Sequence, residues 1–217
     1  SFYLGQELRL KQQYFSVSAS LQDALRRHLV DHENLDNLPD KAVFQLNDTH
    51  PALAIPEMMR LLIDVHGYDW HRAWAITTQC MAYTNHTLLP EALEKWPEDL
   101  IGRMLPRHLM LIQRINYDFL EDIRRRFPGH EDLVRRLSIY DEEGSQRRLR
   151  MANLATIGSF SVNGVAAIHT ELLKSRVLAD FSRVMPEKFN NKTNGVTPRR
   201  WLLSSNPGLA GIITECI

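Results

Sequence analysis

The stretch AVFQLNDTHP, residues 42–51, decides the fold. Its first half, Ala42 to Leu46, is a short apolar run, whereas Asn47 to Pro51 is polar and ends in proline. A short apolar run bounded by turn-forming residues is typical of a strand buried in a parallel sheet. We therefore predict a buried strand at 42–46 whose carboxyl end carries polar side chains.

Helical patterns lie on both sides of this strand. Between residues 7 and 30 apolar side chains recur every three or four positions, which predicts a long helix before the strand. After it, residues 56–66 begin with proline and are followed by Gly67, and Asp69 can cap a further helix that runs past Ile76. The order helix, strand, helix indicates an α/β layer in which helices outnumber strands.

The same alternation continues along the chain. We predict strands at 80–83, 154–157 and 188–190, helices at 90–96, 106–127 and 165–173, and a hairpin or surface loop made of 138–140, a turn at 141–144 and 147–151. Thr197 and Asn206 each precede a proline, so they are expected to cap two final helices.

Composition excludes several classes of protein. The 217 residues are 44% hydrophobic and 24% charged, as in a globular protein, and 26 basic side chains balance 26 acidic ones. A zero net charge argues against a generic nucleic-acid or acidic-membrane binder, and no apolar run approaches the ~18 residues of a spanning helix. Cys80 and Cys216 form neither a disulfide framework nor a zinc spacing, so we expect a cytoplasmic protein.

Three polar clusters stand near the ends of predicted strands, at 47–50, 84–87 and 193–195. In open α/β sheets the ligand lies beyond the carboxyl ends of the strands. Their Asp, Asn, Thr and His side chains suit the hydroxyls of a sugar. Each cluster alone could simply form turns and caps, but the three together favour a sugar site. A metal is less favoured, because His50 and His86 lack a recognisable ligand set.

Five motifs, taken together, resemble the α-glucan phosphorylases, the family of glycogen, starch and maltodextrin phosphorylases. They are QLNDTHP (45–51), AYTNHTLLPEALE (82–94), LPRH (105–108), VNGVA (162–166) and TNGVTPRRW (193–201). The opening ELRLKQQYF (7–15) fits as well. The resemblance therefore runs in order over essentially the whole chain.

The resemblance implies a homodimeric enzyme with a doubly wound, two-domain, GT-B-like glycosyltransferase fold. Residues 1–192 would be the later part of the N-terminal domain, and 193–217 the crossover into the C-terminal domain. The implied reaction transfers a terminal α-1,4-linked glucosyl unit of a glucan to inorganic phosphate, giving glucose 1-phosphate with retention. Pyridoxal phosphate would be the cofactor, its own phosphate serving as proton relay.

The resemblance also assigns roles to particular residues. They are His86 as the catalytic residue and sugar contact, Asp48 and Asn194 as further substrate contacts, His50 as support for the sugar pocket, and Trp201 beside the cofactor. The lysine that holds pyridoxal phosphate and the residues that grip substrate phosphate are expected beyond Ile217. We therefore expect the 217-residue chain alone to be inactive.

Two other functions remain open on the residues alone. A non-catalytic glucan-binding module would use helix 106–127 as a surface contact, but the four tryptophans fall mostly at helical core spacing rather than forming a platform. A purely structural module is the other alternative. The enzyme hypothesis requires that Asp48, His86 and Asn194 converge on one hexose-sized hollow at one rim of the sheet.

Overall fold

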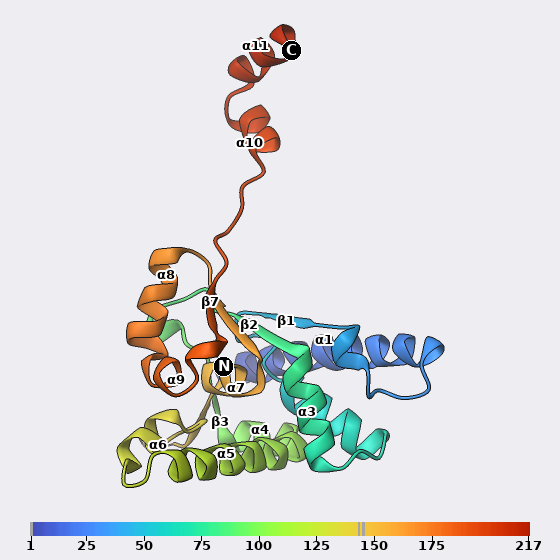
Figure 1. Ribbon diagram of the computed structural model, residues 1–217, viewed down its shortest axis with the longest axis vertical. Coiled ribbons are helices and arrows are strands. Elements are labelled where there is room, and N and C mark those ends of the chain that lie inside the picture. The colour runs from blue at the N-terminus through green and yellow to red at the C-terminus, as the bar shows by residue number, and fades with distance from the viewer. Residues whose placement is uncertain (1, 143, 145) are drawn as a thin grey trace.

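The computed structural model describes residues 2–142, 144 and 146–217. The predicted turn at 141–144 therefore lies partly outside the described residues. The centre of the molecule is a parallel sheet in the order β1 (Phe44–Asn47), β2 (Met81–Thr84), β6 (Ser161–Gly164), β7 (Phe189–Asn191) (Figure 1). The strands predicted at 42–46, 80–83 and 188–190 are confirmed, with small shifts at their ends.

Helical crossovers join these strands, as parallel pairing requires. Between β1 and β2 run α2 (Ala54–Arg60), a π-helical turn (Leu61–Val65) and α3 (Trp70–Cys80). Between β6 and β7 run α8 (Ala167–Leu172), a second π-helical turn (Leu173–Val177), α9 (Ala179–Val184) and a 3-10 turn (Pro186–Lys188). The long α1 (Phe2–Asp31) precedes β1 and packs on α2. The helix–strand–helix order predicted around residues 42–51 is confirmed.

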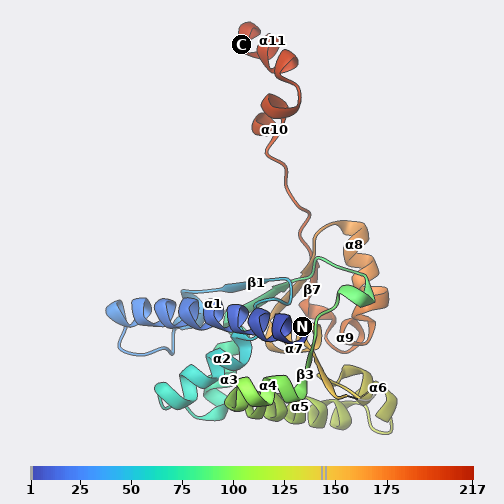
Figure 2. The same ribbon diagram turned by 180° about the vertical axis from the view of Figure 1, so that it is seen from behind.

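The connection from β2 to β6 is much longer and carries a separate layer. It contains α4 (Glu98–Met104), α5 (Pro106–Arg126), α6 (Glu131–Leu137), α7 (Met151–Gly158) and a small antiparallel sheet of β3 (Lys95–Pro97), β5 (Arg148–Arg150) and β4 (Tyr140–Asp141). From behind, α4 and α5 lie on the side of the molecule away from β1 (Figure 2). The predicted hairpin of 138–140 and 147–151 is confirmed by the antiparallel β4–β5 pair.

The prediction of a strand at 154–157 is wrong. Those residues belong to α7, and every residue of this helix is buried. A short apolar run cannot be distinguished from a buried helix by periodicity, because both are apolar on all sides. The third strand of the sheet in sequence order is instead Ser161–Gly164, which the sequence pattern had placed between a turn and a helix.

The structure also differs from two smaller predictions, the helix at 90–96 and the cap at Thr197. Residues 90–96 form a single 3-10 turn (Pro90–Ala92) followed by the start of β3, rather than a helix. Asn206 caps α11 (Pro207–Cys216) by accepting a hydrogen bond from Leu209 N at 3.1 Å. Thr197 makes no such bond with its side chain, so α10 (Pro198–Ser205) begins on the fixed φ of its proline alone.

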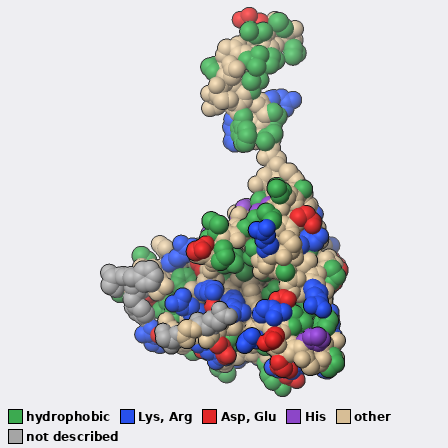
Figure 3. Space-filling view, turned by 90° about the vertical axis from the view of Figure 1, so that its left-hand side faces the viewer, with side chains coloured by type: hydrophobic (Ala, Val, Ile, Leu, Met, Phe, Trp, Pro, Cys, Tyr) green, Lys and Arg blue, Asp and Glu red, His purple; other side chains and the backbone are tan. Residues whose placement is uncertain are grey.

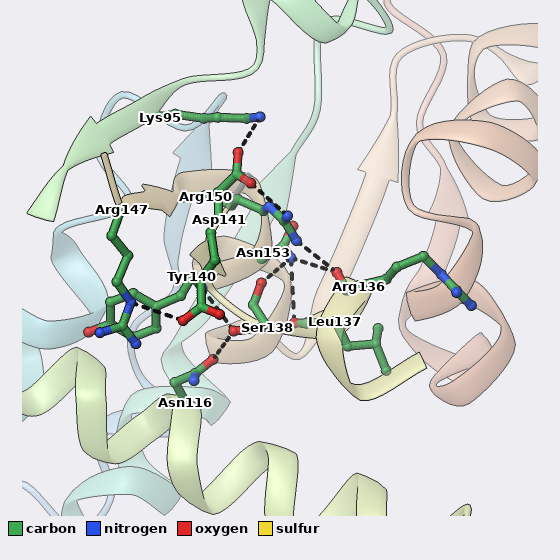
Figure 4. Close-up of polar contacts among 11 residues, drawn as sticks. Lys95, Asn116, Arg136, Leu137, Ser138, Tyr140, Asp141, Arg147, Arg150 and Asn153 are labelled. Atoms are coloured by element: carbon green, nitrogen blue, oxygen red, sulfur yellow. Dashed lines mark hydrogen bonds and ion pairs between the residues drawn. The ribbon is translucent and has the colours of Figure 1, made fainter. Parts of the chain in front are cut away.

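A buried carboxylate ties the small sheet together (Figure 4). Asp141 on β4 accepts from Lys95 Nζ at 2.6 Å and from Arg150 Nη2 at 3.0 Å, which joins β3, β4 and β5. Beneath it, Asn153 of α7 donates to the carbonyl of Ser138 at 2.7 Å. These bonds fix the sheet against α7, and through α7 against the parallel sheet.

A second buried polar cluster joins three helices. Glu57 of α2 is fully buried and accepts from Ser18 of α1 at 2.6 Å and from Arg60 at 2.8 Å through both Nε and Nη2. His108 of α5, also buried, lies with Nε2 2.6 Å from the same carboxylate. Around this cluster the apolar stripe predicted for α1 is buried at Leu10, Val17, Leu21 and Leu25.

The chain leaves the body after β7. Residues 191–200 are exposed, and α10 and α11 stand apart from the body (Figure 1). Figure 3 shows hydrophobic side chains open to solvent along this part of the chain. They include Val196, Trp201, Leu203, Ile212 and Ile217. Within the described residues, none of the helices combines the length and apolar character needed to cross a membrane.

Close packing of α7 on α2 gives a first prediction. A Cβ added at Gly158 would lie 2.5 Å from Ile55 Cδ1 and 2.8 Å from its Cγ1 and Cγ2, and Ile55 is fully buried. We expect Gly158→Ala to lower the free energy of unfolding by about 1–3 kcal/mol in urea denaturation, because the core must open to admit the methyl group. Gly5→Ala on α1, where a Cβ meets nothing within 4 Å, is the control and should be neutral or slightly stabilising. Equal stability of the two variants would contradict this packing.

Candidate functional site

A hollow of about 480 Å³ lies at the carboxyl edge of the parallel sheet. Residues on or just after all four strands line it: Gln45, Asn47, Thr84, His86, Asn163, Val165, Lys192, Thr193, Asn194 and Gly195. Each of the three polar clusters singled out in the sequence contributes to this lining. The hollow lies where ligands bind in open α/β sheets.

Strand register explains why these residues meet. Asn47, Thr84 and Asn163 are paired across β1, β2 and β6. The pairing continues past the strands, because Asp48 N donates to Thr84 O and Asn85 N donates to Asn163 O, both at 2.9 Å. On the other side, Asn194 N donates to Val165 O at 2.9 Å. The backbone that carries His86 and Asn194 is therefore held by the sheet.

A row of side-chain hydrogen bonds crosses the floor of the hollow. Gln45 Nε2 donates to Thr84 Oγ1 at 2.8 Å, and Thr84 Oγ1 donates to Asn163 Oδ1 at 2.9 Å. Asn163 Nδ2 in turn donates to Gly164 O at 2.9 Å. Each of these three side chains already makes a hydrogen bond, which restrains it before any ligand arrives and lowers the entropy cost of binding a polar ligand.

Two histidines stand close to this floor. His86 follows β2, is exposed, and has Nε2 in hydrogen-bond contact with Asn47 Oδ1. His169 of α8 accepts from Val165 N at its Nδ1, at 3.3 Å. Burial, together with the nearby His86, lowers the pKa of His169, which favours its neutral form. The neutral form leaves a polar but uncharged ring beside His86.

The residues that precede His86 are buried. Tyr83 and Asn85 are both fully buried, and Asn85 Nδ2 donates to Tyr83 Oη at 3.0 Å. Burial raises the pKa of Tyr83 above its usual range, although the bond from Asn85 opposes the rise. His86 is therefore presented by a rigid segment that does not itself titrate near neutral pH.

The predicted site residues are only partly brought together. His86 and Asn194 line the same hollow, whereas Asp48 is not among its lining residues. Asp48 has a positive φ of 67°, and its Oδ1 accepts from Thr49 N at 2.6 Å. His50 lines a different hollow, between α1 and the segment Pro90–Trp96. Trp201 lies on α10, 55% exposed and away from the sheet.

Four lining residues lie outside the clusters predicted from the sequence: Gln45, Asn163, Val165 and Lys192. Gln45 lies inside the apolar run of the first strand, and its outward direction follows only from the alternation of side chains along a strand. Asn163 was not recognised because the third strand had been placed at 154–157. With Ser161–Gly164 taken as a strand, Asn163 would have been predicted at the same edge.

A larger hollow of about 510 Å³ lies elsewhere, between α5, α6 and β5. It is the structural counterpart of the predicted surface contact on helix 106–127, because Asn116, Leu120 and Arg124 of α5 line it. Its aromatic side chain, Tyr140, is covered by the guanidinium of Arg147, 3.9 Å from the ring centroid (Figure 4). This hollow therefore offers no open ring on which a sugar could stack.

Comparison with known proteins identifies the family of the chain. The family described as "Carbohydrate phosphorylase" matches residues 1–217, the entire sequence. The chain belongs to this phosphorylase family. It is 56% identical over 213 residues to a glycogen phosphorylase of Synechocystis sp., and 53% identical over 225 residues to the muscle form of glycogen phosphorylase of Oryctolagus cuniculus. These matches cover 98% and 100% of this chain but 25% and 27% of the relatives, so the chain spans about a quarter of their length.

The described residues of this phosphorylase chain do not, by themselves, fit pyridoxal phosphate. The two lysines that flank β7 are both engaged: Lys188, before the strand, donates from Nζ to Thr156 O and Ile157 O at 3.0 Å, and Lys192, after it, contacts Asn190 Oδ1 with Nζ. Burial lowers the pKa of Lys188 to about 8, yet its ammonium caps α7 and is not presented to the hollow. Trp201, the predicted cofactor contact, is exposed on α10.

Proposed function

We propose that this chain forms part of an α-glucan phosphorylase that transfers a terminal α-1,4-linked glucosyl unit to inorganic phosphate, giving glucose 1-phosphate with retention. Membership of the carbohydrate phosphorylase family supports the reaction class. The observation that carries the proposal is the meeting of His86 and Asn194 in one polar hollow at the carboxyl edge of the sheet.

Within this hollow, different side chains would have different roles in binding a glucosyl unit. The imidazole of His86 and the amide of Asn194 would contact sugar hydroxyls, and the bonded row beneath them keeps the hollow polar and rigid. A fixed dipole, such as the backbone carbonyl of His86, would stabilise positive charge developing on the sugar ring. We propose His86 as the catalytic residue and Asn194 as a substrate contact.

The other proposed site residues act from positions beside the hollow. Asp48 follows β1 directly, and its carboxylate is oriented by Thr49 N. His50 lines a different hollow, with Arg9 and the segment Pro90–Trp96, so its proposed role is support rather than direct contact. Trp201 would contact pyridoxal phosphate only in the whole protein, where residues outside this chain would hold the cofactor.

The whole protein is proposed to have the two-domain GT-B-like architecture, with pyridoxal phosphate as cofactor, a homodimeric assembly and a cytoplasmic location. The boundary between its domains would lie near 193–197, where the chain leaves the sheet and becomes fully exposed. These proposals rest on the family and on the exposed crossover segment.

A chimera tests the function directly. The 217 residues would replace the matching quarter of the Synechocystis glycogen phosphorylase, and glucose 1-phosphate formed from a maltodextrin and phosphate would be measured. We expect the chimera to be active and the 217-residue chain alone to be inactive. A folded chimera that binds maltodextrin but forms no glucose 1-phosphate would favour the glucan-binding alternative instead.

A further inference from the structure

The contact between Asn47 and His86 has a chemical consequence. Asn47 is the last residue of β1, and its side-chain oxygen Oδ1 lies in hydrogen-bond contact with Nε2 of His86. An amide oxygen can only accept a hydrogen bond, so Nε2 must carry the proton. In a neutral imidazole the other nitrogen, Nδ1, is then an acceptor with a free lone pair.

The surroundings leave that acceptor available. Among the described residues, the hydrogen bond to Asn47 is the single one made by the imidazole of His86. Two titratable groups share its surroundings: His169 of α8, which interacts with it electrostatically, and Lys192, which lines the same hollow. Neither donates to His86: His169 Nδ1 accepts from Val165 N while its buried Nε2 has no hydrogen-bond partner among the described residues, and Lys192 Nζ contacts Asn190 Oδ1.

We propose that Asn47 is a positioning residue that fixes His86 in its Nε2–H tautomer, so that Nδ1 is the acceptor offered to a hydroxyl of the bound sugar. An acceptor at this point selects ligands that carry a hydroxyl hydrogen and disfavours those that present only oxygen acceptors. This inference rests on the proposed sugar site, but the tautomer itself is a property of the chain.

The backbone geometry shows why Asn47 can hold this role. Asn47 is in register with Thr84, two residues before His86, and both flanking segments are bonded into the sheet. The sheet therefore holds the end of β1 and the segment just after β2 side by side, and these two segments carry the two side chains. Fixing the ring in this way removes the entropy cost of orienting it when the ligand binds.

Nuclear magnetic resonance on the ¹⁵N-labelled chain tests the proposal without any turnover. Long-range ¹H–¹⁵N spectra at pH about 9, where ordinary imidazoles are neutral, report which nitrogen of each of the nine histidines carries the proton. The His86 signals are assigned by their loss in His86→Gln. We expect Nε2 to be protonated in more than about nine-tenths of the molecules, the population that a net hydrogen bond of about 1.4 kcal/mol maintains.

Variants separate positioning from mere folding. Asn47→Ala should give a mixture of both tautomers at His86, and Asn47→Asp, which keeps an acceptor, should restore the Nε2–H form. Asn37→Ala is a matched control, because Asn37 Oδ1 contacts His28 Nε2 at 2.9 Å in the same manner far from the hollow. It should alter the signals of His28 and leave those of His86 unchanged.

Each outcome either supports or overturns the proposal that Asn47 fixes the tautomer of His86. An Nδ1–H tautomer or a mixture in the unmodified chain overturns the proposal, whatever the variants do, and so does an unchanged tautomer in a folded Asn47→Ala. Stepwise addition of glucose then separates the proposal from the proposed function. A fixed tautomer without a glucose-induced shift at Nδ1 contradicts the sugar site and leaves the role of Asn47 intact.

Discussion

Glu57→Ala is expected to lower the free energy of unfolding by about 3–5 kcal/mol, the largest stability effect that we expect from a single substitution in this chain. The carboxylate is fully buried and accepts bonds from α1, from its own helix and from α5. Its removal leaves the guanidinium of Arg60 and the buried ring of His108 without their shared acceptor. An uncompensated buried polar or charged group costs far more than an exposed one.

An exposed ion pair on the same part of the molecule supplies the control. Asp64, in the turn that continues α2, forms two bonds with Arg107 of α5, at 2.7 and 2.9 Å. Asp64→Ala should cost about 1 kcal/mol or less, because both partners are accessible to water. Urea unfolding of both variants at neutral pH measures the difference. A Glu57→Ala variant as stable as Asp64→Ala would show that the cluster is dispensable.

The same cluster sets a dependence on pH. Burial alone would raise the pKa of Glu57, but the bonds from Arg60, His108 and Ser18 outweigh it and lower the pKa to about 2, from an ordinary 4.5. The folded state therefore holds the carboxylate ionised, and the stabilisation is complete above pH 4.5. It is lost as the pH falls towards 2. The destabilisation caused by Glu57→Ala should shrink over this interval, whereas a constant difference would contradict the lowered pKa.

The spacing of apolar residues was enough to predict the helices that bury one face and expose the other. The stripe of α1 repeats at helical spacing, and α5 was predicted over nearly its whole length because its apolar and charged faces are distinct. The buried α7 was mistaken for a strand because it has no polar face to reveal its period. The small sheet β3–β5–β4 was only half predicted, since β3 is paired with a strand more than fifty residues away.

The candidate site was predicted at the level of clusters and less well at the level of residues. All three polar clusters reach one hollow because parallel strands end at the same edge of the sheet. Which residue of a cluster lines the hollow depends on local backbone angles. The left-handed conformation of Asp48 and its bond to Thr49 N are not encoded in residue spacing, and Asn47 takes the lining position beside His86.

His86→Ala, introduced into the chimera with the Synechocystis enzyme, is expected to reduce kcat/KM for phosphorolysis on the order of 10²-fold. The imidazole of His86 lines the hollow from a rigid segment, and truncation removes both the ring and its acceptor nitrogen. A lost contact that matters in the transition state lowers kcat as well as kcat/KM. Steady-state rates of glucose 1-phosphate formation at varied maltodextrin give both constants.

Two further histidine variants make this result specific. His71→Ala, at an exposed position on α3, should leave both constants unchanged. His50→Ala should have a smaller effect than His86→Ala because His50 lines a different hollow. If Asn47 acts only through His86, adding Asn47→Ala to His86→Ala should cost nothing more, since the two changes remove one interaction. Equal losses at His50 and His86 would move the proposed sugar site towards the hollow beside Pro90–Trp96. An additive loss at Asn47 would instead give its amide a contact of its own with the substrate.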